Sequence, residues 1–137
     1  MSLFKVFDIA GSGMSAQMLR LNTVSSNLAN SQTVSATEEG AYRSRHPVFQ
    51  TMLDDVSNNS GSKVKVTQII ESDASIPVQY MPNHPLANAE GYVYGSNVNA
   101  VEEMTNMMSA SRSYQNNTEM MNTSKELLLR TLQLGRG

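Results

Sequence analysis

The sequence predicts a mainly α fold with a small β insertion, in which the N- and C-terminal helices pack as a coiled-coil-like hairpin. Three observations carry this prediction. Apolar residues recur at every seventh position near both ends of the 137 residues. Residues 14–39 and 96–134 contain neither Gly nor Pro, and all four prolines lie between these ranges. A sustained seven-residue apolar repeat is typical of helices packed side by side.

The N-terminal helix is expected within residues 3–37. Its apolar repeat consists of Phe7, Met14, Leu21 and Leu28. Gly11 and Gly13 weaken its start, because each Gly costs a helix about 1 kcal/mol relative to Ala. The stretch 22–37 is rich in Ser, Thr and Asn, whose side chains compete for hydrogen bonds with the backbone. We therefore expect this helix to depend on packing against other helices.

The C-terminal helix has clearer boundaries. Its apolar repeat consists of Met107, Tyr114, Met121 and Leu128. Asn99 is placed to act as the N-cap, with Glu102 three residues later, as in a capping box. Gly135 is placed to end the helix. A helix over residues 100–134 is about 50 Å long at 1.5 Å per residue.

The segment between these helices is expected to be β-rich. Residues 64–69 alternate apolar and polar side chains, as a half-buried strand does. Residues 76–81 and 92–94 are further candidate strands, and 71–75 is placed to close a hairpin between the first two. The composition of 57–62 predicts a loop. The chain is thus divided into a terminal helical domain, residues 3–37 plus 97–134, and an insertion, residues 38–96.

The surfaces of these helices carry few charges. Between Ile9 and Thr37 the only charged residue is Arg20. Because a water-facing helix surface normally displays charge, we expect these helices to contact neighbours on several sides. The expected packing residues between helices and between subunits are Phe7, Met14, Met18, Leu21, Leu28, Met104, Met107, Tyr114, Met121, Leu128 and Leu132. An ordinary core has the same stripe, and the methionines fit core filling as well as an adaptable partner surface.

Composition argues against several classes of function. The net charge is −2 without a cluster of Lys or Arg, so we expect no binding to nucleic acid. No apolar run approaches the roughly 20 residues of a transmembrane helix. The first residues lack the pattern of a cleaved signal peptide. The absence of Cys removes disulfides and thiolate chemistry. We expect no cofactor and no small-molecule substrate.

The titratable residues do not form a candidate catalytic, cofactor-binding or metal site. His46 and His84 each precede a proline, so they belong to extended segments, and nothing near them has metal-ligand spacing. The acidic pairs 38–39, 54–55 and 102–103 consist of adjacent residues. Adjacent side chains point to different faces of a helix or strand, which disfavours a paired-carboxylate site. We expect the protein not to be an enzyme.

Two motifs resemble a known family. Residues 9–17 (IAGSGMSAQ) and 26–30 (SNLAN) resemble the N-terminal signature of flagellar rod and hook proteins. Residues 96–104 (SNVNAVEEM) and 111–114 (SRSY) resemble their C-terminal signature. The rest of the chain is similar to the proximal-rod branch of this family at Tyr80, Pro82, residues 84–87, residues 91–93 and residues 132–136.

The resemblance implies a structural subunit of the basal-body rod, which assembles helically in the periplasm and transmits torque. It implies that the termini form the inner layer of the rod and the middle segment an outer domain. The implied partners are copies of the chain, other proximal and distal rod subunits, and the flagellar type III export apparatus, which such proteins pass without signal cleavage. The alternative interpretation is a coiled-coil adaptor or an export-apparatus interaction protein.

Overall fold

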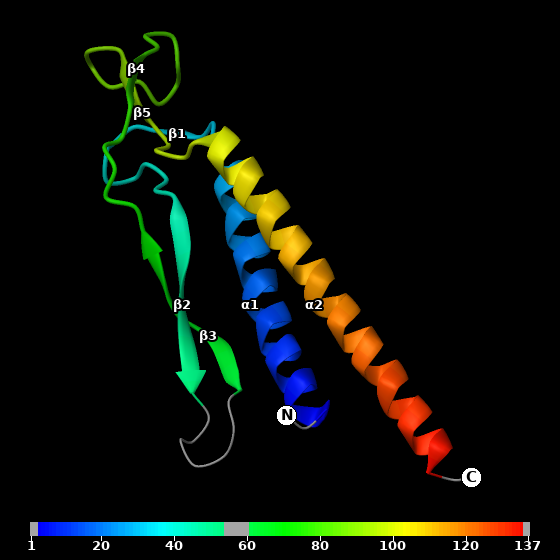
Figure 1. Ribbon diagram of the computed structural model, residues 1–137. Coiled ribbons are helices and arrows are strands. Elements are labelled where there is room, and N and C mark those ends of the chain that lie inside the picture. The colour runs from blue at the N-terminus through cyan, green and yellow to red at the C-terminus, as the bar shows by residue number, and fades with distance from the viewer. Residues whose placement is uncertain (1–2, 54–60, 136–137) are drawn as a thin grey trace.

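The computed structural model describes residues 3–53 and 61–135, which form two long helices, a two-stranded hairpin and a three-stranded sheet (Figure 1). Helices make up 49% and strands 22% of this part of the chain. The two predicted terminal helices and the β-containing middle segment are present. The prediction of a mainly α fold holds only in part: helix is the larger share, but the middle segment pairs over longer strands than its short apolar alternations indicate.

Helix α1 spans Leu3–Ala29 and therefore ends well before residue 37, the end of the predicted N-terminal segment. Local hydrogen bonds explain where it stops. The Asn30 side chain donates to the Ser26 carbonyl oxygen at 2.8 Å, and the Ser31 hydroxyl donates to the Leu28 carbonyl at 2.8 Å. These polar side chains satisfy two carbonyls of the last helical turn, those of Ser26 and Leu28, and so favour the end of the helix here.

Helix α2 spans Ala100–Leu134, which are the predicted bounds. The Asn99 side chain accepts hydrogen bonds from the backbone N–H groups of Val101 and Glu102, at 3.1 and 3.4 Å, and so acts as the predicted N-cap. Gly135 is the C-cap, and its N–H donates to the Thr131 carbonyl at 3.1 Å. Asn99 and Gly135 therefore set the two ends of α2, as the sequence predicts.

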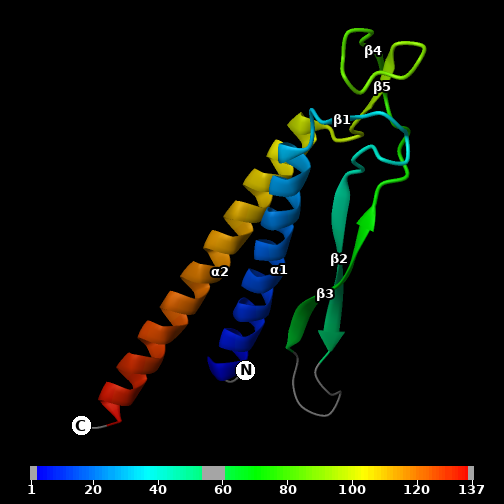
Figure 2. The same cartoon turned by 180° about the vertical axis from the view of Figure 1, so that it is seen from behind.

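The two helices run antiparallel, side by side, in both views of the molecule (Figures 1 and 2). The end of α1 lies beside the start of α2, where the Arg20 guanidinium donates to the Asn106 side chain at 2.9 Å. Helix α2 is longer than α1 by eight residues, 35 against 27, and it extends past the start of α1 at the opposite end (Figure 1).

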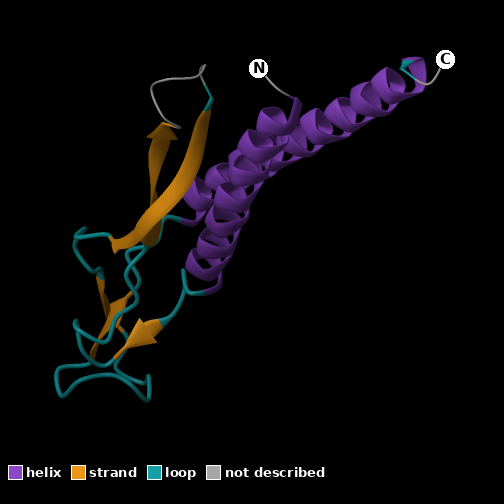
Figure 3. Ribbon diagram, turned by 90° about the horizontal axis from the view of Figure 1, so that it is seen from below, coloured by secondary structure: helices purple, strands orange, loops and turns teal. Residues whose placement is uncertain are grey.

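A β-hairpin lies along α1 on the side away from α2 (Figures 1 and 3). Strand β2, Arg45–Leu53, pairs antiparallel with β3, Ser62–Glu71, and the register shifts between Val48 and Phe49. The predicted strand at 64–69 is thus confirmed. The predicted hairpin between it and residues 76–81 is wrong, because β3 pairs with β2. Of the predicted loop at 57–62, residues 57–60 lie outside the described residues, as do the acidic residues 54 and 55.

The second sheet lies beyond the end of α1 and the start of α2 (Figure 1). Its strand order is β1–β5–β4, from β1 (Val34–Ser35), β5 (Tyr92–Gly95) and β4 (Val78–Tyr80), all antiparallel. The predicted strands at 76–81 and 92–94 are both found, and they pair with each other. Gly91 in the intervening turn has φ +84°, and a Cβ there would lie 2.9 Å from the Tyr80 ring, so this position requires Gly.

Large apolar side chains are scarce in the core. Among the described residues, the largest fully buried side chains are those of Val93 and Asn27, and the helices bury mainly small residues such as Ala10, Ala16 and Ala110. Many large apolar side chains are exposed instead. No described helix has both the length and the apolar character needed to cross a membrane. The buried core of the chain is therefore small for its length.

Candidate subunit-assembly interface

The face of α2 toward α1 follows intervals of three and four residues. Its deepest positions are small or polar: Glu103 is 2% exposed, Ala110 0% and Ser124 6%. Beside them, three or four residues away along the helix, lies the predicted apolar stripe Met107, Tyr114, Met121 and Leu128, all half-buried. The stripe is therefore one column of a two-column seam, and the other column lets the helix backbones approach each other.

The facing residues of α1 follow the same intervals. Contacts with α2 place Gly13, Met14, Arg20 and Asn27 on this face, and Ala10, Gln17 and Val24 lie at the same helical spacing from them. A Cβ placed on Gly13 would lie 3.0 Å from the amide nitrogen of Asn117, so Gly at this position permits close approach of the helices. The amide oxygen of Gln17 is buried and has no hydrogen-bond partner among the described residues.

None of the predicted packing residues is fully buried within the chain. Met18, Met104 and Leu132 are exposed, with 50%, 56% and 57% of their surface accessible. The other eight are half-buried: Phe7, Met14, Leu21, Leu28, Met107, Tyr114, Met121 and Leu128. On α1, the stripe residues Met14, Leu21 and Leu28 each directly follow a residue that contacts α2, namely Gly13, Arg20 and Asn27. The structure brings Met14 to α2, where its sulfur accepts a hydrogen bond from the Thr118 hydroxyl at 4.0 Å.

The buried Asn27 joins three elements at the end of the helical pair. Its Nδ2 donates to the Arg45 carbonyl at 2.8 Å and to Glu103 Oε2 at 3.0 Å. Its Oδ1 accepts from the Arg45 N–H at 2.9 Å and from the Tyr42 hydroxyl at 3.0 Å. All four hydrogen-bonding positions of the amide are used. Asn27 therefore fixes α1 to the start of β2 and to the first turn of α2.

A second asparagine, Asn97, fixes the segment that enters α2. Its Oδ1 accepts from the Ser44 N–H at 2.7 Å, and its Nδ2 donates to the carbonyls of Ser72 and Ala74 at 3.3 and 3.0 Å. Asn27 and Asn97 belong to the two terminal sequence motifs, which are far apart in the chain and meet here. We call these two asparagines and the residues bonded to them the junction.

Sequence reasoning missed the small and polar column of the seam. Gly13, Glu103, Ala110 and Ser124 carry no apolar signal, so a search for hydrophobic repeats passes over them. One sequence feature could have identified three of them: Glu103, Ala110 and Ser124 are separated by multiples of seven residues, as the residues of the apolar stripe are. Within residues 3–53 and 61–135, no group of three or more His, Asp or Glu side chains is placed to hold a metal ion. Both histidines bond locally, His46 to Ser44 and His84 to the Leu86 N–H.

The two terminal motifs match family models. Residues 7–37 match the model described as "Flagella basal body rod protein". Residues 89–134 match the model described as "Flagellar basal body rod FlgEFG protein C-terminal". These matches include α1 from Phe7, the whole of α2 and both junction asparagines.

Similar proteins cover the chain from end to end. The chain is 48% identical to the flagellar basal-body rod protein FlgC of Salmonella typhimurium, across 98% of this chain and 99% of that protein. It is 47% identical to FlgC of Yersinia enterocolitica over the same shares, and 36% identical to FlgC of Bacillus subtilis, across 99% of this chain and 100% of that protein. At these identities over full length, the chain belongs to the FlgC family of flagellar basal-body rod proteins.

Proposed function

We propose that the chain is a structural subunit of the flagellar basal-body rod and that its helical pair packs against neighbouring subunits. Family membership supports the structural role over a coiled-coil adaptor or an export-apparatus component. The observation that carries the packing role is the exposure of large apolar side chains along both helices. On α1 and α2 these are Phe4, Met18, Val101, Met104, Met108, Met120, Leu127, Leu129, Leu132 and Leu134. Extended apolar surface of this kind marks protein–protein contact.

The coiled-coil-like packing of the two helices is part of this proposal. The intervals of three and four residues on both sides of the seam support it, since they are those of coiled coils. We propose that the terminal helical domain of residues 3–37 plus 97–134 makes most subunit contacts and that the insertion of residues 38–96 lies outside it. The half-buried stripes then contact α1 or α2 on one side and a neighbouring subunit on the other.

Folding and assembly are coupled in this proposal. The small core, together with two glycines and many Ser, Thr and Asn residues in α1, leaves the helices short of internal stabilisation. Such a chain suits passage through the flagellar type III export apparatus in unfolded form, without signal cleavage. Its helices then become fully ordered in the periplasm, on contact with copies of the chain and with other proximal and distal rod subunits.

The test is the substitution Leu128→Asp in a strain that lacks its own rod protein of this family. We expect export to persist, and incorporation into isolated basal bodies and motility to be lost, because the substitution places a charge in the seam. The matched control is Asn83→Asp, which adds the same charge on an exposed turn. Normal motility with Leu128→Asp, or failure of the unmodified chain to enter basal bodies, contradicts the proposal.

A further inference from the structure

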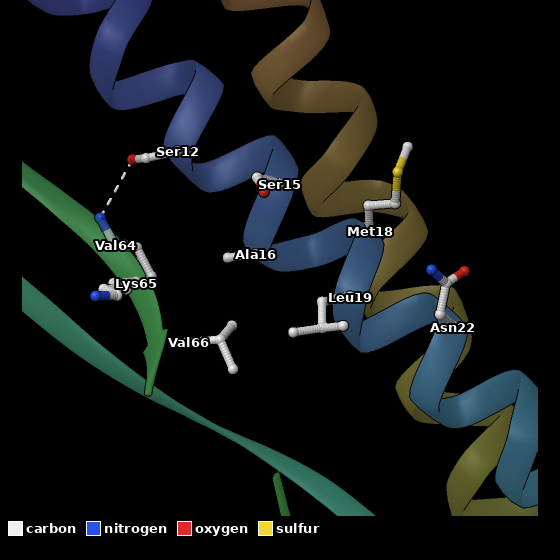
Figure 4. A pocket seen from close by; sticks show the side chains of 9 residues that line it. All are labelled: Ser12, Ser15, Ala16, Met18, Leu19, Asn22, Val64, Lys65 and Val66. Atoms are coloured by element: carbon white, nitrogen blue, oxygen red, sulfur yellow. Dashed lines mark hydrogen bonds between the residues drawn. The ribbon is translucent and has the colours of Figure 1, made fainter. Parts of the chain in front are cut away.

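A groove of about 520 Å³ lies between α1 and β3, on the side of α1 that faces away from α2 (Figure 4). Its α1 side is formed by Ser12, Ser15, Ala16, Met18, Leu19 and Asn22, and its β3 side by Val64, Lys65 and Val66. The small residues Ser12, Ser15 and Ala16 leave room, while Leu19 and Val66 point toward each other across the apolar part (Figure 4).

The walls of the groove are fixed in place. The Val64 N–H donates to the Ser12 hydroxyl at 3.2 Å, and that hydroxyl donates to the Ile9 carbonyl at 2.8 Å. Lys63 Nζ lies 3.3 Å from Asp8 Oδ2. These bonds hold β3 against α1 at one end of the groove. The groove is therefore a formed feature of the subunit, open along about 15 Å of α1 between residues 12 and 22.

The end of α2 exposes several large apolar side chains within the described part of the chain. It extends past the start of α1 (Figure 1), and its last turns expose Leu127 (51%), Leu129 (50%), Leu132 (57%) and Leu134 (83%). At 100° per residue these four leucines point in several directions around the helix axis. A helix that is apolar on several sides is normally buried.

One face of this helical end matches the groove. Met120, Leu127 and Leu134 are exposed and lie seven residues apart, so they form one line along the helix. The exposed acidic residues Glu119 and Glu126 flank this line, and Lys65 is an exposed base at the edge of the groove. An apolar helix face beside a carboxylate is thus complementary to an apolar groove beside an ammonium group.

We propose that the groove between α1 and β3 receives the end of α2 from a second copy of the chain. Leu127 and Leu134 then lie on the apolar part of the groove, and Glu126 lies beside Lys65. The end of α2 within one chain does not reach this groove, because α2 runs along the opposite side of α1 (Figure 4). The contact is head-to-tail and repeats from copy to copy, as helical assembly requires. This inference rests on the proposed rod function.

The first test uses the absence of cysteine from the chain. One copy carries Ser15→Cys in the groove, and a co-expressed copy carries Thr131→Cys beside the Leu127 line. Isolated basal bodies are oxidised, and disulfide-linked dimers are measured on non-reducing gels. We expect efficient cross-linking, because the proposed contact brings these two positions within the Cα separation of about 7 Å that a disulfide needs. The control pair is Ser15→Cys with Gln115→Cys, which lies far from the end of α2.

The outcomes separate this inference from the proposed function. If both cysteine copies enter basal bodies and cross-link no better than the control pair, or only to another rod protein, the inference is wrong while the rod function stands. If the unmodified chain is absent from basal bodies, the rod function itself fails, and this inference fails with it.

If the cysteine copies do not assemble, charge-reversal variants test the same contact. We expect Lys65→Glu and Glu126→Lys each to lower incorporation about fivefold, the effect of losing a partly exposed ion pair. The double variant restores the attraction with opposite signs, so we expect incorporation to return toward the unmodified level. Losses that add in the double variant overturn the contact, because independent sites add and paired sites compensate.

Discussion

Replacing Asn27 by Leu tests whether the junction holds the subunit together. Leucine has the same number of side-chain heavy atoms as asparagine, with the same branch at Cγ, so the substitution removes hydrogen bonds without opening a cavity. Asn27 is 0% exposed and uses all four hydrogen-bonding positions of its amide. The expected result is a subunit in which α1, β2 and α2 no longer share a fixed end.

The magnitude follows from the groups that lose a partner. The Arg45 N–H, the Arg45 carbonyl and the Glu103 carboxylate each lose a hydrogen bond, whereas the Tyr42 hydroxyl keeps Ser26 at 3.2 Å. A buried polar group left unpaired costs about 1–3 kcal/mol. Arg45 is an exposed residue, so water replaces part of the loss at its backbone. We therefore expect about 3 kcal/mol of destabilisation, toward the lower end of the sum for three groups.

The assay measures the temperature at which isolated basal bodies release the chain. For cooperative unfolding of a chain of this size, about 3 kcal/mol lowers the midpoint by roughly 10 °C. Asn30→Ala is the matched control, since among the described residues the Asn30 side-chain amide donates to the Ser26 carbonyl alone, and the loss of this bond costs about 1 kcal/mol. Release of the Asn27→Leu chain within about 2 °C of the unmodified chain refutes the role of the junction.

The same assay checks substitutions at four further positions. Gly11→Ala raises the release temperature, because Ala favours the helix by about 1 kcal/mol and, apart from its chain neighbours and its own helix backbone, no described heavy atom lies within 4 Å of the added Cβ. Gly13→Leu lowers it, since its side chain meets Asn117 in the seam; equal effects at the two glycines contradict close helix approach. Gln17→Leu raises it by removing a buried, unpaired amide oxygen, and a decrease shows that this oxygen has a partner in the rod. Asn99→Ala costs about 1 kcal/mol while Asn99→Asp retains the cap, so equal losses refute the capping role.

Local sequence accounts for the ends of the helices. Asn99 caps α2 with its own side chain, and Gly135 ends it, so both signals act within one turn of the backbone. The end of α1 at Ala29 was not predicted, although its cause is equally local: Asn30 and Ser31 bond back to the last carbonyls. Ser, Thr and Asn occur along much of this segment, so composition alone does not distinguish the residue at which such bonds end the helix.

The face on which each helix packs required the tertiary structure. A seven-residue repeat fixes a period but not a phase, and in α1 the period of Phe7, Met14, Leu21 and Leu28 is shared by the neighbouring column of Ala10, Gln17 and Val24. The deepest positions of the two helices are mainly small residues, such as Ala10 and Ala110, which leave room for the other backbone. That choice depends on both helices together, as Gly13 opposite Asn117 illustrates.

The sequence by itself determined that the chain has two terminal helices, three of the five strands and the membership of a rod-protein family. These features follow from local capping, side-chain alternation and motifs that lie close together in the chain. Only the tertiary structure decided that β3 pairs with β2, that Asn27 and Asn97 meet at one junction, and that a groove remains beside α1. The junction and the groove join residues far apart in the sequence. Strands β2 and β3 are consecutive, but the local sequence of β3 does not select β2 over β4 as its partner. These partners are selected by the free energy of packing the whole chain rather than by any local preference.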